Sequence, residues 1–127
     1  MKKIDNILVT GSGGVTGKAV KRISKKYKDK HFIFVDSSDL DLRNFKNTQS
    51  FLRNNKIDKV INLAAVSGGI GISLKHPASM LRDNVLINLS IVEACVSCNI
   101  KKLLLTLTTG MYPENSKLPL IEDYIHD

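Results

Sequence analysis

The sequence is poor in the residues that mark several classes of protein. It has two cysteines, no tryptophan and three prolines in 127 residues. Two cysteines cannot build the disulfide framework of a small secreted domain. Cys95 and Cys98 have the C-x-x-C spacing of some metal and redox sites, but no second ligand pair or histidine lies nearby in the sequence. We therefore expect two cysteines of a buried helix and no metal site.

Long apolar runs are also missing. No run reaches the roughly 18 residues that a membrane-spanning helix requires, so we expect no membrane partner. The first six residues, Met1-Lys2-Lys3-Ile4-Asp5-Asn6, lack the apolar stretch of a signal peptide, so we expect a cytoplasmic protein. With 43% hydrophobic and 24% charged residues, the chain has the composition and length of one globular domain, residues 1–127.

Acidic residues are outnumbered by basic ones, 12 against 19, which gives a net charge of +7. A basic surface can bind nucleic acid. The lysines of residues 18–30 instead belong to an amphipathic helix, whose apolar side repeats every four residues at Val15, Ala19, Ile23 and Tyr27. Aromatic residues do not alternate with these lysines as a base-stacking surface requires. We therefore expect no nucleic-acid partner.

Short apolar runs alternate with amphipathic segments along the chain. The runs predict four strands, at residues 4–10, 31–36, 59–63 and 102–108. Three- and four-residue periodicity predicts helices at residues 15–27 and 77–98. Phe45, Phe51 and Leu52, set among polar residues, predict a further helix at residues 44–55. The glycine-rich residues 64–75 are expected to form a loop, and residues 110–127 an irregular segment. Because right-handed crossovers join such alternating elements, we predict an α/β fold: a Rossmann-type parallel sheet with strand order 3-2-1-4 and helices on both faces.

A glycine-rich loop joins the first predicted strand to the first predicted helix. Its sequence is Thr10-Gly11-Ser12-Gly13-Gly14-Val15-Thr16-Gly17. Gly11 permits a sharp turn, Gly14 lets phosphates approach the backbone, and Gly17 lets the helix pack closely. Free amides and the positive dipole end of the helix would then bind a diphosphate. We therefore expect the loop to bind NAD or NADP rather than to be a plain turn.

Asp36 ends the second predicted strand, 19 residues after Gly17. An acidic residue there can accept hydrogen bonds from the ribose hydroxyls of the cofactor and would repel a 2′-phosphate, which favours NAD over NADP. Two alternatives remain open. Asp36 could instead cap a turn, and Ser37 and Ser38 could hydrogen-bond a phosphate. The Asp41-Leu42 pair is expected to lie along the adenine.

Several motifs resemble those of the extended short-chain dehydrogenases, the NAD-dependent epimerase/dehydratase family. They are the glycine loop and residues 62–65, 66–70, 81–85 and 108–113, in the family's order and spacing. The resemblance is nearest to the GDP-L-fucose synthases, which are NADP-dependent. It implies that Leu63, Ala64 and Ala65 line the cofactor floor and that Thr108 is the catalytic hydroxyl that polarises a sugar ketone. It also implies a GDP-sugar substrate and a homodimer formed through helix 77–98.

The chain departs from this family at the residues that move protons. Gly110 stands where the family has a cysteine acid/base, and the family's Tyr-x-x-x-Lys pair, which supplies a proton donor, is absent. We therefore expect an incomplete half-domain without the C-terminal substrate domain, inactive alone, whose fourth strand is an exposed apolar edge. The other hypothesis is a non-catalytic NAD(P)-binding or interaction fragment.

Overall fold

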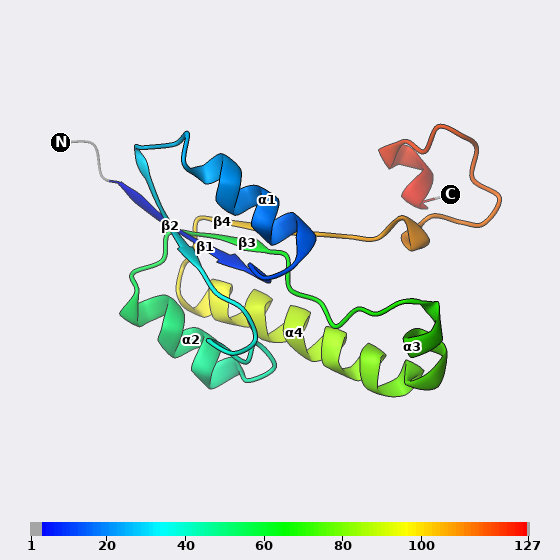
Figure 1. Cartoon of the computed structure of the whole chain (residues 1–127), viewed down its shortest axis with the longest axis horizontal. Helices are drawn as coiled ribbons and strands as arrows, with labels where there is room; N and C mark the ends of the chain where they lie inside the picture. The colour runs from blue at the N-terminus through cyan, green and yellow to red at the C-terminus, as the bar shows by residue number, and fades with distance from the viewer. Residues whose placement is uncertain (1–3, 127) are drawn as a thin grey trace.

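The computed structural model describes residues 4–126. Strands and helices follow one another along the chain as the sequence predicts, and two 3₁₀ turns follow the last strand (Figure 1). The elements are β1 (Asp5–Thr10), α1 (Val15–Ser24), β2 (Lys30–Phe34), α2 (Phe45–Asn54), β3 (Lys59–Asn62), α3 (Ile70–Lys75), α4 (Pro77–Ser97), β4 (Lys102–Leu105) and the 3₁₀ turns η1 (Thr109–Met111) and η2 (Glu122–His126).

The four strands form one parallel sheet in the order β2-β1-β3-β4. The predicted Rossmann-type parallel sheet with helices on both faces is confirmed, but the predicted order 3-2-1-4 is wrong. Figure 1 shows α1 on one face of the sheet and α2 with α4 on the other. Since crossovers are right-handed, a connection through α2 on the face opposite α1 must return the chain past β1. β3 therefore pairs with β1 and not with β2.

Apolar residues of α2 and α4 fix α2 to that face. Leu52 of α2 and Ile91 of α4 are almost fully buried, in one cluster with Leu8 of β1 and Val60 of β3. The Ser90 hydroxyl of α4 also donates to Thr48 Oγ1 of α2 at 3.4 Å. This cluster is the main hydrophobic core of the described chain.

The α1 face of the sheet is covered unevenly. Val9, Ile61 and Leu104 form one row across β1, β3 and β4. Val9 is fully buried, Ile61 is half-buried and Leu104 is 51% exposed. The helix α1 therefore shields β1 on this face, while β4 lies open to solvent.

Three local features differ from the expected ones or refine them. The last strand ends at Leu105, earlier than predicted, and the expected loop of residues 64–75 contains the short helix α3. Cys95 is buried in the core as expected, and burial raises the pKa of its thiol to about 11. Cys98 is half-buried.

In the part of the chain that the structure describes, no helix combines the length and apolarity needed to cross a bilayer.

Candidate functional site

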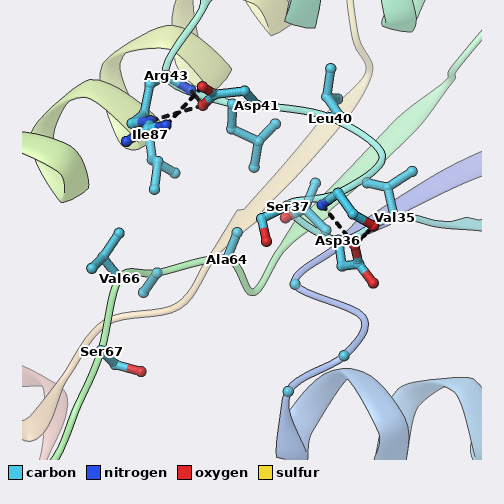
Figure 2. A pocket seen from close by; sticks show the side chains of 17 residues that line it. Val35, Asp36, Ser37, Leu40, Asp41, Arg43, Ala64, Val66, Ser67 and Ile87 are labelled. Atoms are coloured by element: carbon cyan, nitrogen blue, oxygen red, sulfur yellow. Dashed lines mark hydrogen bonds and ion pairs between the residues drawn. The ribbon is translucent and has the colours of Figure 1, made fainter.

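A cavity of about 790 Å³ opens at the carboxyl end of the sheet (Figure 2). Its wall comes from the glycine loop after β1, the segments after β2 and β3, and Ile87 of α4. The volume is within the range of small-molecule and cofactor sites. At this place the connections of β1 and β3 leave the sheet toward opposite sides. Open α/β sheets bind their ligands at such a switch point.

Gly11 and Gly17 give the glycine loop its shape. Gly11 has a φ of +66°, and a Cβ at this position would lie 2.7 Å from the carbonyl carbon of Leu63. At Gly17 a Cβ would meet the Gly11 carbonyl oxygen and would lie 2.6 Å from Ser12 Cα. A side chain is therefore excluded at both positions, which allows the loop to fold directly against the start of α1.

The start of α1 has free backbone amides and no side chain that competes for them. The N-cap residue is Gly14, which has no side chain that could accept hydrogen bonds from the first amides. The first turn contains no acidic residue. Lys18 N donates the first bond of the helix to Gly14 O at 2.9 Å. The amides of Val15, Thr16 and Gly17 therefore precede any intrahelical acceptor. Together with the helix dipole, they favour an anion beside Gly13 and Gly14, which line the cavity.

Asp36 lies beside the glycine loop and is held by its neighbours. Its Oδ1 accepts hydrogen bonds from the Ser38 hydroxyl at 2.7 Å and from Ser38 N at 2.9 Å. These bonds, with a smaller contribution from Asp39, hold the pKa of the Asp36 carboxyl below its usual value. The Oδ2 atom lies 3.8 Å from the place a Gly13 Cβ would occupy. Asp36 Oδ1 therefore caps the turn, as one alternative expected. Asp36 Oδ2 takes no part in this cap and faces the glycine loop.

Arg43 lies across the cavity from Asp36 and is bound by carboxylates (Figure 2). Its Nε and Nη2 each lie 2.9 Å from an oxygen of Asp41, and its Nη1 lies 3.2 Å from Asp83 of α4. This two-point pairing with Arg43 lowers the pKa of Asp41 and raises that of Arg43 itself. The cluster ties the segment after β2 to α4.

Residues 64–67, which follow β3, form the floor of the cavity, and Asn84 of α4 holds them in place. Asn84 Oδ1 accepts from Val66 N at 2.9 Å, and Asn84 Nδ2 donates to Val66 O at 2.8 Å and to Met80 O at 2.9 Å. At the strand ends, the buried Thr10 hydroxyl donates to Asn62 Oδ1 at 2.6 Å. The segment after β3 is therefore anchored at both ends.

Comparison with known proteins places this arrangement in a family. Residues 7–127 match the NAD dependent epimerase/dehydratase family. The chain belongs to this family.

Several similar proteins carry the name GDP-L-fucose synthase or synthetase. The GDP-L-fucose synthase of Dictyostelium discoideum is 32% identical over 123 residues, which are 95% of this chain and 38% of that protein. The probable GDP-L-fucose synthase of Drosophila melanogaster is 33% identical over 129 residues, covering 100% of this chain and 39% of that protein. A solved GDP-L-fucose synthetase from Naegleria fowleri, bound to NADP, superposes with a TM-score of 0.86 at 34% identity and covers 99% of this chain and 38% of its own. The chain thus spans about two fifths of the length of these family members.

The structure brings most of the predicted cofactor residues to the cavity wall. They are Thr10, Gly11, Gly13, Gly14, Asp36, Ser37, Ala64 and Ala65. Asp41 and Leu42, the pair expected to lie along the adenine, also line the cavity. Five other predicted residues do not line the cavity: Ser12, Val15, Thr16, Gly17 and Leu63. Ser12 N bonds Val35 O, and the Leu63 backbone supports Gly11. Val15, Thr16 and Gly17 could still contact a dinucleotide through their backbone amides, which have no intrahelical acceptor.

Thr108, the predicted catalytic hydroxyl, stands apart from the described cavity wall. It lies beyond the end of β4, is exposed, and accepts a hydrogen bond from Gly110 N at 3.3 Å. Its role stays a prediction.

Sequence reasoning missed Arg43, Asn84 and Ile87. Ile87 lies inside the predicted helix of residues 77–98, but the helix prediction does not indicate which residue faces the cavity. The pairing of Arg43 with Asp41 follows an i, i+2 spacing that has no helical or strand signature. Asn84 lies within the family motif of residues 81–85, but its bonds to Val66 span 18 residues. The bonds of Asn84 to Val66 and of Arg43 to Asp83, and the position of Ile87, depend on how α4 crosses the sheet.

Proposed function

We propose that this chain is the cofactor-binding part of a nucleotide-sugar epimerase or reductase of the GDP-L-fucose synthase type. It binds a nicotinamide dinucleotide, NAD or NADP, in the cavity at the carboxyl end of β1 and β3. The observation that carries the proposal is the uncapped start of α1, which follows a loop too tight for side chains and borders a cavity of about 790 Å³. The NADP-bound relative of the same fold supports it.

The residues of the cavity fit the parts of a dinucleotide. Amides at the start of α1 would bind the diphosphate, since Gly13 and Gly14 leave its approach open. The Oδ2 atom of Asp36 would accept a bond from a ribose hydroxyl. Leu42 would contact the adenine, and Ala64 with Ala65 would support the nicotinamide half. When bound, the nicotinamide would supply hydride transfer.

The substrate step rests on fewer residues. Thr108 Oγ1 accepts from Gly110 N, which leaves its proton free to donate to a sugar carbonyl. Gly110 itself has no group that could move a proton. This observation favours the second candidate, a dinucleotide-binding fragment without turnover of its own, over an active epimerase. A GDP-sugar remains the proposed substrate of the complete enzyme.

The exposed side of α4 supports a homodimer. One stripe of this helix carries Leu81, Val85, Leu89 and Val96, which are 52–73% exposed. A second copy would bury this stripe by packing the same helix against it. We expect sedimentation to show a dimer that Leu89→Lys dissociates; a monomer at all concentrations would contradict this part of the proposal.

Calorimetric titration of the full chain with NAD⁺ and NADP⁺ tests the main proposal. We expect at least one of them to bind, and Gly14→Val to abolish binding because the branched side chain would crowd the diphosphate position. Gly71→Val is the matched control, since a Cβ there has no atom within 4 Å. Failure of both dinucleotides to bind a sample that circular dichroism shows to be folded would overturn the proposal.

A further inference from the structure

We infer that the adenosine end of the cavity selects a dinucleotide whose ribose carries no 2′-phosphate, so that the chain takes NAD in preference to NADP. The inference rests on the proposed function and concerns only which cofactor is chosen. It sets this chain apart from the Naegleria fowleri relative, whose structure holds NADP.

Ser38 is the first reason. A 2′-phosphate beside the end of β2 would need hydrogen-bond donors from the residues that follow Val35. The backbone amide and the hydroxyl of Ser38 both donate to Asp36 Oδ1, at 2.9 Å and 2.7 Å. Of the two serines that could hydrogen-bond a phosphate, Ser37 and Ser38, Ser38 would have to break these bonds to do so. The same bonds hold the carboxylate in place, with Oδ2 on the side of the glycine loop.

The second reason is the charge of the cavity wall. Among the described residues that line it, three carry formal charge: Asp36, Asp41 and Arg43. Arg43 makes two bonds to Asp41 and one to Asp83, so its guanidinium is already neutralised. Figure 2 shows it turned toward Asp41, across the cavity from Asp36. The wall therefore has no uncommitted cation beside the ribose position.

The basic residues of α1 do not alter this charge pattern. Lys21 contacts β2, but its Nζ lies over the Phe34 ring, 5.6 Å from the centroid, and Lys21 is not part of the cavity wall. A phosphate with roughly two negative charges would face the carboxylate of Asp36. A ribose with free hydroxyls would instead donate to Oδ2. The same carboxylate thus favours one cofactor and repels the other.

Paired titrations test the inference on the full chain, with binding as the readout. The probes are NAD⁺ and NADP⁺, and also 5′-ADP and 2′,5′-ADP, which isolate the adenosine end. We expect the ligand without the 2′-phosphate to bind at least about tenfold more tightly in both pairs. Asp36→Asn should bring each ratio close to one, and Asp36→Ser combined with Ser38→Arg should reverse it. Glu93→Gln, on the exposed side of α4, removes one negative charge away from the cavity and should leave the ratios unchanged.

Each outcome has a separate meaning. Tighter binding of NADP⁺ and 2′,5′-ADP to the unaltered chain would overturn the inference and leave the proposed function standing. An equal change of the ratio in Asp36→Asn and Glu93→Gln would also overturn it, because the effect would then come from net charge alone. Binding of none of the four probes would overturn the proposed function as well. Circular dichroism of each variant shows that the comparison is made on folded protein.

Discussion

At Gly11 two constraints act on the same residue. The backbone has a φ of +66°, where side chains are disfavoured, and a Cβ would lie 2.7 Å from the Leu63 carbonyl carbon. Neither the strand end nor the residues after β3 can move without disturbing the other. This position therefore couples the glycine loop to the cavity floor.

Replacing Gly11 with alanine tests this coupling. We expect Gly11→Ala to lower the free energy of unfolding by about 2–3 kcal/mol, from backbone strain and the displaced Leu63 carbonyl. Gly69→Ala serves as control: no atom lies within 4 Å of its Cβ position, and the expected change is within about 0.5 kcal/mol. Urea unfolding measures both. Equal effects of the two substitutions would show that the Leu63 contact is unimportant.

At the residue scale, the sequence predicts the steric role of the loop glycines better than the conformation of Asp36. The spacing of Gly11, Gly14 and Gly17 has a steric cause that acts within a few residues, so it can be inferred without a structure. The state of Asp36 cannot be inferred in this way. Its two oxygens have different surroundings only because Ser38 bends back onto one of them. Such a choice depends on rotamers that a sequence pattern does not specify.

At the element scale, α4 does more than cover the sheet. Its Asn84 side chain bonds both backbone groups of Val66 and so fixes the segment that lines the cavity floor. Asp83, the preceding residue, pairs with Arg43 from the opposite wall. One turn of this helix therefore positions two sides of the cavity.

Hydrogen exchange at Val66 tests the role of Asn84. In Asn84→Ala the Val66 amide loses its acceptor, so we expect its exchange to accelerate and the free energy of unfolding to fall by about 1 kcal/mol. Asn88→Ala is the control, because the bond of Asn88 Nδ2 goes to the Asn84 carbonyl within the same helix. Unchanged protection of Val66 in Asn84→Ala would contradict the assigned anchoring.

The strand order shows what element patterns leave undetermined. The apolar residues set among polar ones in residues 44–55 predict a helix, and α2 is found at Phe45–Asn54. The pattern reveals one apolar face but not the side of the sheet that receives it. That side follows from the fit of Leu52 against Ile91 and the rest of the core, between segments far apart in sequence. Crossover handedness then fixes the strand order. Because the sequence does not show which face of the sheet α2 covers, the predicted position of β3 was wrong.

At the scale of the whole molecule, the sheet has one closed and one partly open face. Leu103 of β4 packs against the core beside α4, whereas its neighbour Leu104 is 51% exposed on the α1 face. Exposed apolar residues on an edge strand invite association. The chain spans about two fifths of the length of its relatives.

Matched substitutions in β4 separate the two faces. We expect Leu104→Thr to reduce binding of an apolar dye and self-association while stability stays within about 0.5 kcal/mol, since threonine suits a strand. Leu103→Thr should instead destabilise the chain by about 1–3 kcal/mol, because it removes buried apolar atoms and inserts a hydroxyl. Dye fluorescence, sedimentation and urea unfolding measure these effects. Equal loss of stability in both variants would contradict the described difference in burial.

Binding of a diphosphate by the amides at the start of α1 is the central claim. Titration of the isotopically labelled chain with NAD⁺, followed by amide NMR shifts, tests it most directly. We expect the largest shifts at Gly13–Gly17 and at Asp36, with small changes on the outer side of α4. Saturable shifts confined to other elements, with Gly13–Gly17 unaffected, would contradict the account.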